Sequence, residues 1–213
     1  MLTVRQFVFS PLQENTYVLY NREGEALIID PGCYTASEEQ RLAAFITDHH
    51  LQPKWLLNTH CHLDHVFGNR FVHLRWGLEP YIHPLEKPLL DLAAEAGLRW
   101  NLPFRNYEGP VHYIRGGDRV GLRGDELEVI EAPGHSPGHV CFYKKDQGFL
   151  VGGDVLFRRS IGRTDLPGGN HSQLLRSIRE QIFVLPGETV VYPGHMESTT
   201  VGEEKKWNPF LQD

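Results

Sequence analysis

The chain contains few cysteines and no long apolar run. Its three cysteines, Cys33, Cys61 and Cys141, are an odd number without the spacing of a disulfide framework, which favours reduced thiols in a reducing compartment. No apolar segment approaches the ~20 residues that span a bilayer. Residues 1–9 also lack the charged region and the apolar core of an export signal. We therefore expect a cytoplasmic protein that does not bind membranes.

An excess of positive charge is also missing. The 213 residues include 21 Lys and Arg against 27 Asp and Glu, which gives a formal net charge of −6. Because nucleic-acid binders rely on a general electrostatic attraction to phosphates, we expect no nucleic-acid partner. The length suits one domain, and the sequence has no linker, low-complexity tract or charge block. We predict a single domain over residues 1–213.

Apolar patterning predicts strands and helices in both halves of the chain. Ser37 and Gln40 have the spacing of a capping box and should begin a helix, and another helix should run from Val66 to Trp76. Two further helices are expected at 84–96 and 172–183. The expected strands are 4–9, 16–20, 26–29, 55–57, 81–82, 127–130, 140–143, 149–151 and 189–192. Strands in both halves with helices between them predict an α/β sandwich, with two sheets face to face and helices outside.

Histidine, in contrast, is abundant, and three of the twelve histidines lie in one short segment. Residues 60–65 read His-Cys-His-Leu-Asp-His, at the corner where a buried strand is expected to meet a helix. Three imidazoles this close would repel one another if protonated, so a shared cation is the economical explanation. Zinc and iron both accept imidazole and carboxylate ligands. Cys61 is expected to be a buried thiol outside the site. Structural or solvated roles are expected for His49, His73, His83 and His112.

Three later strands each end in glycine followed by a potential metal ligand. These ligands are His135 after Gly134, Asp154 after Gly153, and His195 after Gly194. Glycine lets the backbone turn tightly just before the ligand, and strand ends are rigid platforms for a site with strict geometry. If the strands align, the three residues meet the early histidine segment at one sheet edge.

The number of candidates predicts two metal ions. Seven residues exceed the three protein ligands plus water of one catalytic zinc. The first ion would be held by His60, His62 and His135. The second would be held by Asp64, His65 and His195. Asp154 would bridge them, because a carboxylate has two oxygens. Two ions ~3.5 to 4 Å apart would share a water molecule and lower its pKa towards ~7, which makes hydroxide available at neutral pH. Asp64 and Asp154 are therefore also predicted to be catalytic.

Four motifs, in order and across nearly the whole chain, resemble the metallo-β-lactamase superfamily. They are THCHLDH at 59–65, APGHSPGH at 132–139, GGDVLF at 152–157 and YPGH at 192–195. Within that superfamily the chain is similar to short glyoxalase II-like hydrolases, in PLQENTYVL at 11–19, GRTDLPGG at 162–169 and TTVGEEKKWNPFL at 199–211. The resemblance implies a four-layer αββα sandwich and a hydroxyacylglutathione hydrolase-type reaction. It also implies two divalent ions, with zinc expected first and iron or manganese as alternatives.

The implied substrate is a small-molecule thioester such as S-lactoylglutathione. The hydroxide would attack the thioester carbonyl, and the thiolate leaves without a proton because a thiol has a pKa of ~8.5. Arg163 matches a basic glutathione-binding residue of the family and is predicted to anchor a substrate carboxylate, although Asp165 stands where an aromatic residue is often found. The helical C-terminal extension of full-length glyoxalase II enzymes has no counterpart in residues 1–213. We therefore expect no separate substrate domain, which leaves glutathione recognition open.

Several alternatives remain at this point. A persulfide dioxygenase shares these motifs and uses one iron, which His60, His135 and Asp154 could hold as a facial triad. Lactone hydrolysis is a second alternative. A β-lactamase is disfavoured by the missing export signal and by Asp154, where many such enzymes carry a cysteine. The last alternative hypothesis is a metal-binding protein without catalytic activity.

The ligand count generates a first prediction. Purified protein should hold about two metal ions per chain, because seven converging ligands exceed the needs of one ion. Elemental analysis of the protein, normalised to its concentration, measures this ratio. A single iron per chain would instead favour the dioxygenase.

Overall fold

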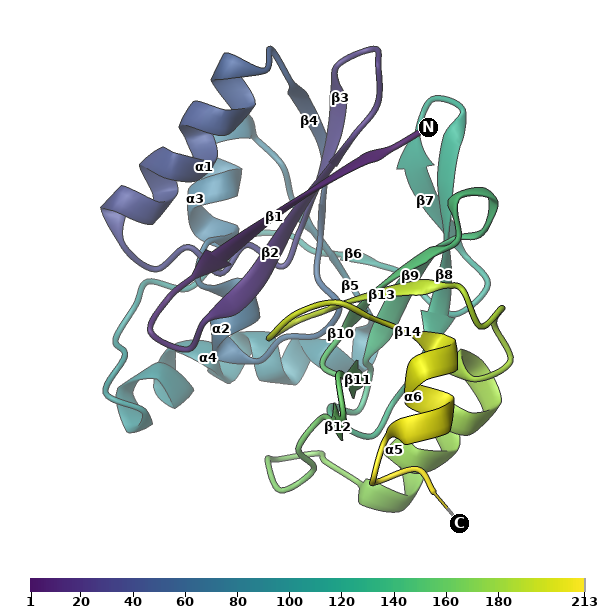
Figure 1. Ribbon diagram of the computed structural model, residues 1–213. Helices are drawn as coiled ribbons and strands as arrows, with labels where there is room; N and C mark the ends of the chain where they lie inside the picture. Colours follow the sequence, from purple (N-terminus) through teal and green to yellow (C-terminus); the bar gives the residue numbers. More distant parts are fainter. Residues whose placement is uncertain (213) are drawn as a thin grey trace.

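Two six-stranded sheets form the centre of the protein in the computed structural model, which describes residues 1–212 (Figure 1). The first sheet contains, in spatial order, β1 (Thr3–Phe9), β2 (Glu14–Tyr20), β3 (Glu25–Ile29), β4 (Gln52–Leu57), β5 (Pro80–Ile82) and β6 (His112–Tyr113). Its first three strands are antiparallel, and β3 to β6 are parallel. The residues of β3 after Glu25 are all buried, because both faces of this strand are covered.

The second sheet comes from the later half of the chain. Its strands, in spatial order, are β14 (Thr199–Thr200), β13 (Val190–Pro193), β10 (Phe149–Gly153), β9 (Val140–Lys144), β8 (Asp125–Glu131) and β7 (Arg119–Leu122). Strands β10 and β13 are parallel, whereas β9 is antiparallel to both β8 and β10. A small hairpin of β11 (Leu156–Phe157) and β12 (Ser160–Ile161) follows β10.

Helices cover the outer faces of both sheets. Helices α1 (Ala36–Asp48) and α3 (Asn69–Trp76) lie against the first sheet, and α5 (His171–Ser177) and α6 (Val201–Trp207) lie against the second (Figure 1). Helices α2 (Leu63–Val66) and α4 (Lys87–Arg99) lie at the end of the sandwich. Short turns η1 (Pro84–Glu86) and η2 (Lys145–Gln147) and a π-helical turn η3 (Ile178–Ile182) complete the described elements. None of the described helices is both long and apolar enough to span a bilayer.

The buried side chains confirm the four-layer αββα sandwich. One apolar cluster joins the inner faces of the two sheets and includes Leu19 and Leu27 from the first sheet and Phe142 and Val151 from the second. A second cluster fills the space between the first sheet and α1, and a third lies between the second sheet and α5. Each sheet therefore buries one face against the other sheet and one face against helices.

Two predicted helix boundaries are wrong. Helix α1 is capped by Thr35 and Glu38, not by Ser37 and Gln40: the Thr35 hydroxyl accepts from the Glu38 amide, and the Glu38 carboxylate accepts from the Thr35 amide. The helix predicted from Val66 to Trp76 is interrupted at Gly68. There the Gly68 amide donates to the Pro31 carbonyl over 2.7 Å, and a Cβ would collide with the loop before α1.

The C-terminal helix α6, which patterning did not predict, is held by a buried carboxylate. Glu204 accepts hydrogen bonds from Thr199 Oγ1 (2.6 Å), the Arg159 amide (2.8 Å) and Asn208 Nδ2 (2.9 Å). Its side chain is completely buried. This one residue therefore ties α6 to the loop between β11 and β12.

We expect Glu204→Ala to lower the free energy of unfolding by about 3 kcal/mol, because several buried donors lose their acceptor. Chemical denaturation measures this quantity. The exposed neighbour Glu203 provides the control, since Glu203→Ala should change the free energy of unfolding by less than about 0.5 kcal/mol. Equal effects of the two substitutions would contradict the role assigned to Glu204.

Candidate metal centre

All seven predicted metal-site residues lie together at one end of the sandwich. His60 follows β4, His62 caps α2, and α2 itself carries Asp64 and His65. In the second sheet β9 runs antiparallel between β8 and β10, and β13 is parallel to β10. Strands β8, β10 and β13 therefore all end at the same edge. The residues that follow them there are His135, Asp154 and His195.

The glycines before these ligands are required by their surroundings. Gly153 has a φ of +49°, and a Cβ there would collide with the side chains of Thr59 and His139. A Cβ at Gly194 would collide with the carboxylate of Asp154. The first collision involves residues next to the seven predicted ligands and the second involves one of these ligands, so glycine lets two strand ends approach the site closely.

Three histidine side chains form the first group. The ring nitrogens of His60, His62 and His135 all lie within 4.8 Å of one another. His62 Nδ1 is 2.8 Å from His135 Nε2, and His135 Nε2 is 3.2 Å from His60 Nε2. These three nitrogens converge on one point from two different loops.

Asp64, His65 and His195 form the second group, also with donor atoms within 4.8 Å of one another. His195 Nε2 lies 3.2 Å from Asp64 Oδ2. Asp154 lies between the two groups. Its Oδ2 is 3.5 Å from His135 Nε2 and 3.6 Å from His195 Nε2, and its Oδ1 is 3.5 Å from His65 Nε2. A carboxylate in this position can contact ions in both groups.

Hydrogen bonds on the outer side fix the orientation of four imidazoles. Each uses Nδ1 for a partner outside the cluster and turns Nε2 inward. The Nδ1 contacts are His60 to Thr59 Oγ1 (3.0 Å), His65 to Asp30 Oδ2 (3.0 Å), His135 to the Arg163 carbonyl (2.8 Å) and His195 to the Gln13 carbonyl (3.2 Å). Carbonyl and carboxylate oxygens only accept, so three of these Nδ1 atoms carry a proton, and in the neutral form of each ring Nε2 keeps the lone pair.

The fourth imidazole, His60, has the same tautomer for a different reason. Thr59 Oγ1 donates its proton to Asp30 Oδ2 over 2.6 Å, so it can only accept from His60 Nδ1. The lone pairs of His60 Nε2 and His135 Nε2 therefore face each other at 3.2 Å with no proton between them. Among the described residues, His65 Nε2 and Asp154 Oδ1 are also buried atoms without a hydrogen-bond partner. Cations bound to the two groups would satisfy these four atoms, so the cluster suits a dinuclear metal site.

Burial and neighbouring charges shift the protonation states of the cluster in two directions, and only part of the cluster is shifted towards the forms that metal binding needs. Burial lowers the pKa of His60 and brings that of His62 down to about 3, and neighbouring histidines add to both shifts. Burial alone would raise the pKa of Asp154, but His65 and His195 hold it far below its usual range. His65 and His195 differ, because nearby carboxylates, Asp154 above all, outweigh the effect of burial and raise the pKa of both. Neutral imidazole and ionised carboxylate are the forms that coordinate metals.

Two supporting residues went unrecognised in the sequence. Asp30 is buried at the end of β3 and accepts from the Thr59 amide (2.7 Å), Thr59 Oγ1 and His65 Nδ1. His139 accepts from the Asp154 amide (3.0 Å) and stacks on His60 with ring centroids 4.8 Å apart. The second histidine of APGHSPGH was the available signal for His139. Asp30 carried no signal beyond its place at a strand end.

A third unrecognised residue, Glu86, connects the two loops that carry the first histidine group. Its carboxylate is buried and accepts from the Cys61 amide (2.8 Å) and the Gly138 amide (2.7 Å). Cys61 lies between His60 and His62, and Gly138 lies three residues after His135. Burial raises the pKa of Glu86, and these hydrogen bonds oppose the shift. One side chain thus sets the relative position of both loops.

The remaining predicted residues lie outside the cluster. The Arg163 guanidinium is half-exposed and makes two hydrogen bonds to the Asp165 carboxylate, at 2.7 and 2.8 Å. It lies at the rim of a pocket of about 490 Å³ that His62, Asp64 and Asp154 also line. Cys61 is buried in an apolar cluster with Ile82. The histidines expected to be structural bond elsewhere: His49 to Phe45, His73 to Leu78, His83 to Leu85 and Glu131, and His112 to Glu79.

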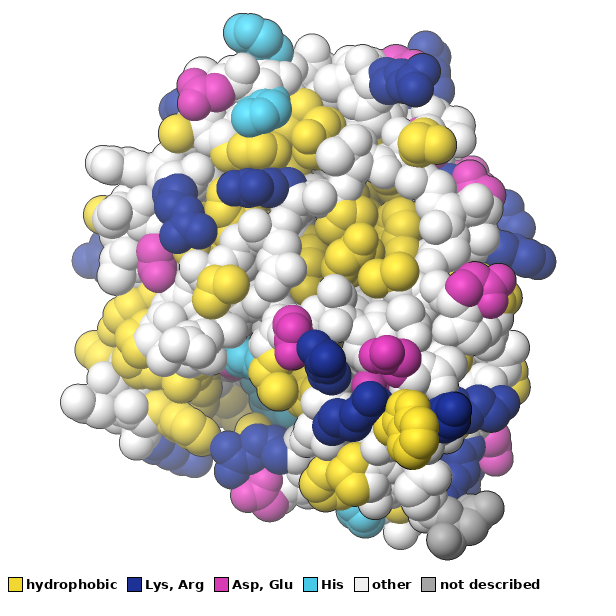
Figure 2. Space-filling model, viewed as in Figure 1, with side chains coloured by type: hydrophobic (Ala, Val, Ile, Leu, Met, Phe, Trp, Pro, Cys, Tyr) yellow, Lys and Arg dark blue, Asp and Glu magenta, His cyan; other side chains and the backbone are white. Residues whose placement is uncertain are grey.

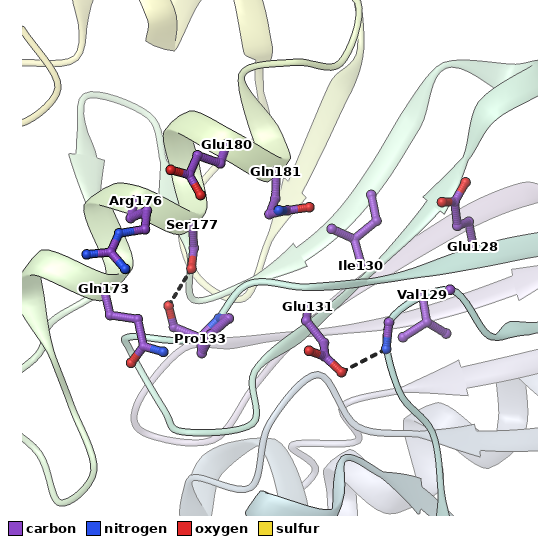
Figure 3. Close-up of a pocket in the computed structure, with 12 residues that line it drawn as sticks. Glu128, Val129, Ile130, Glu131, Pro133, Gln173, Arg176, Ser177, Glu180 and Gln181 are labelled. Atoms are coloured by element: carbon purple, nitrogen blue, oxygen red, sulfur yellow. Dashed lines mark hydrogen bonds between the residues drawn. The ribbon is translucent and has the colours of Figure 1, made fainter.

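A second pocket, of about 400 Å³, lies away from the metal-site cluster, between β8 and the helical segment of α5 and η3 (Figure 3). Ser177 Oγ donates to the Pro133 carbonyl over 2.7 Å, and the Gly116 amide donates to Glu131 over 2.9 Å. Among the described residues that line it there is no histidine.

Comparison with known proteins agrees with this geometry. Residues 9–195 match the family model described as the metallo-beta-lactamase superfamily. The chain is 38% identical to the "probable metallo-hydrolase YqgX" of Bacillus subtilis, over 97% of this chain and 96% of the relative. It is 36% identical to the "hydroxyacylglutathione hydrolase GloC" of Haemophilus influenzae, over 93% of each chain.

Two solved structures are similar over nearly their whole length. A structure described as BLEG-1 B3 metallo-beta-lactamase has a TM-score of 0.91 and 37% identity, and the match covers 99% of this chain and all of that one. The structure of TTHA1623 "in a di-iron-bound form" has a TM-score of 0.87 and 39% identity, with 97% of this chain and all of that chain covered. The fold expected from the sequence is therefore confirmed.

Because Glu86 sets the spacing of two histidine loops, we expect Glu86→Gln to weaken metal binding about 10- to 100-fold. The amide can accept from one backbone N–H, but its NH2 group then faces the other N–H. Competition with a chromophoric chelator measures the affinity. Glu79→Gln, at a partly exposed glutamate paired with His112, is the matched control and should leave it unchanged. Equal affinities for all three proteins would disprove the positioning role.

Proposed function

Because this chain belongs to the metallo-β-lactamase superfamily, we propose that it is a metal-dependent hydrolase of small-molecule thioesters. The observation that carries the proposal is the position of Asp154. Its Oδ2 lies within 3.6 Å of a histidine from each of the two groups, as a bridging carboxylate requires. A site built in this way serves hydrolysis of an activated acyl group.

In the proposed arrangement each group of side chains holds one ion. His60, His62 and His135 hold the first, and Asp64, His65 and His195 hold the second. When bound, two ions supply hydroxide at neutral pH and stabilise negative charge that develops on the carbonyl oxygen. Asp154, which lines the pocket, would contact both ions. The outer hydrogen bonds from Thr59, Asp30 and two backbone carbonyls keep the imidazoles in the required tautomer.

Thioesters suit this site because their hydrolysis needs no protein acid. A thiolate leaves unprotonated, since its conjugate thiol has a pKa of ~8.5. Besides the proposed ligands, the ionisable side chains among the described lining residues are those of Cys61, Glu95, Arg99 and Arg163. The name of the Haemophilus influenzae relative supports S-lactoylglutathione as the first substrate to test.

We propose zinc as the metal, with iron or manganese as alternatives. Imidazole-rich sites with carboxylates accept zinc readily, and the resident metal also depends on its availability in the cell. The similar structure in a di-iron-bound form supports iron as the first alternative.

A mononuclear iron persulfide dioxygenase is the second candidate function. The geometry that favours it is the proximity of His60, His135 and Asp154, two imidazoles and one carboxylate around one point. Hydrolysis of a β-lactam is the third candidate function, and it is suggested by the description of the BLEG-1 structure. Thiol release, oxygen uptake and β-lactam absorbance distinguish the three reactions with the same purified protein.

For the thioesterase we expect Asp154→Ala to lose bound metal and to lower thiol release from S-lactoylglutathione by at least about 100-fold, because both sites share this carboxylate. Elemental analysis and a thiol-reactive dye provide the two measurements, and circular dichroism checks the fold. Asp146→Ala, at an exposed aspartate just before β10, should behave like the wild type. Full activity in Asp154→Ala would refute the mechanism.

A further inference from the structure

Helix α4 presents an apolar stripe to the pocket that holds the metal-site cluster. The stripe consists of Leu89, Leu92, Ala93, Ala96 and Trp100, the last being the C-cap of the helix. The spacing of 3, 4, 7 and 11 residues from Leu89 places all five on one face. The same pocket is lined by His62, Asp64 and Asp154. The stripe is therefore continuous with the site of the proposed reaction.

Part of this stripe and of the remaining pocket lining is exposed to solvent, whereas Ala93, Phe157 and Ile161 are buried. The relative exposure is 52% for Leu92, 45% for Trp100 and 57% for Met196, which lines the pocket from the other side. Further apolar lining comes from Leu12, Phe157, Ile161, Leu166 and Pro167. In Figure 2, histidine atoms are visible in a hollow at the lower left, and hydrophobic side chains lie beside it. Exposed apolar surface around polar reactive groups is typical of a ligand site, and about 490 Å³ is enough for a small molecule.

The two arginines that line the pocket already have acidic partners. Arg163 makes two hydrogen bonds to Asp165, and Arg99 lies 3.8 Å from Glu95 one helical turn earlier. The Arg163 guanidinium also lies over the Trp100 ring, 5.7 Å from its centre. A substrate arm with carboxylates would have to displace these partners. An uncharged arm could bind without displacing Asp165 or Glu95 from the arginines.

We propose that the site takes thioesters in which one arm is an uncharged hydrocarbon chain, packed along the Leu92 and Trp100 face of α4. This inference rests on the proposed thioesterase function and specifies its substrate class. Leu92 and Trp100 are specificity-determining residues, and Arg163 is part of the pocket wall with its charge balanced by Asp165. Glutathione is not required as the thiol.

A series of acyl thioesters of N-acetylcysteamine, from acetyl to octanoyl, tests this with the metal-loaded protein. A second series keeps the acetyl group and varies the thiol from glutathione to alkanethiols, so that either arm can be the apolar one. We expect kcat/KM to rise about two- to fourfold per added methylene in one of the two series. A flat response in both, or a preference for glutathione over every alkyl thiol, would overturn the inference.

A pair of leucines on the same helix provides the matched variants. Leu92→Ala should flatten the chain-length dependence, because it removes part of the apolar wall. Leu98 is also exposed, at 68%, but does not line the pocket, so Leu98→Ala should leave the dependence intact. Equal effects of the two substitutions on the dependence would reject α4 as the specificity surface.

Binding of an uncleavable ligand separates this inference from the proposed reaction. S-hexyl-N-acetylcysteamine, a thioether, should bind wild type and Leu98→Ala at least about tenfold more tightly than its S-methyl analogue, and Leu92→Ala should lose most of that difference. Calorimetry measures both affinities without any reaction. If the protein hydrolyses all the thioesters but binds the S-hexyl ligand no more tightly than the S-methyl ligand, only the proposed binding of an apolar arm is refuted. A preference for S-hexyl without thioester hydrolysis would refute only the reaction.

A second copy of the chain is the other possible occupant of this face. Sedimentation would then give the mass of a dimer for the wild type and of a monomer for Leu92→Ala. That result would overturn the assignment to a substrate arm. A mass that is the same in both variants, together with the S-hexyl preference, supports it.

Discussion

The whole site depends on buried lone pairs that the protein forces to face one another. His60 and His135 point unprotonated nitrogens at each other across 3.2 Å, and each is held there by a hydrogen bond on the far side of its ring. Without an electrophile between them this arrangement is repulsive. Burial lowers the pKa of both rings, so protonating either of them to relieve the repulsion costs free energy. The surrounding structure can be understood as the scaffold that keeps these rings from turning away.

That scaffold is built from strand ends and backbone hydrogen bonds. Three strands of the second sheet end at one edge because β9 reverses direction between β8 and β10, and the packing of the first sheet brings the residues after β4 to the same place. Glu86 then joins the loop of His60 and His62 to the loop of His135 through two amides. Asp30 connects Thr59 and His65 in a similar way, by accepting hydrogen bonds from the Thr59 amide and from His65 Nδ1. Polar groups that never touch the cluster's centre thus determine its geometry.

The α/β sandwich was predicted from the strands and helices in both halves of the chain, and its αββα layering from the family resemblance. All seven cluster residues were predicted because the glycine before each late ligand and the dense histidine segment are local signals. The residues it missed act over long separations in the chain. Glu86 accepts from Gly138, 52 positions away, and Asp30 from His65, 35 positions away, and nothing in the local pattern marks such partners. The pairing of Arg163 with Asp165 was equally hidden, since two residues of opposite charge can point in different directions. Helix α1 begins at Ala36, with Thr35 as its N-cap. Thr35 and Glu38 have the same spacing as the predicted pair Ser37 and Gln40, and tertiary contacts such as the hydrogen bond from the Ser10 amide to Glu38 favour the first pair.

The position of helix α4 has a consequence for how this protein could change. Its apolar stripe comes from one contiguous stretch, residues 89–100, whereas the cluster residues come from α2 and four separate strand ends. The helix is held in place by Leu90, Gly97 and Ala93 of the stripe, with Leu89 packed against the same core, whereas Leu92, Ala96 and Trp100 are not buried. Substitutions at Leu92, Ala96 or Trp100 can therefore reshape what enters the pocket while the reactive centre and the fold stay intact. A few substitutions along one helix are therefore enough to change the range of substrates while the reaction stays the same.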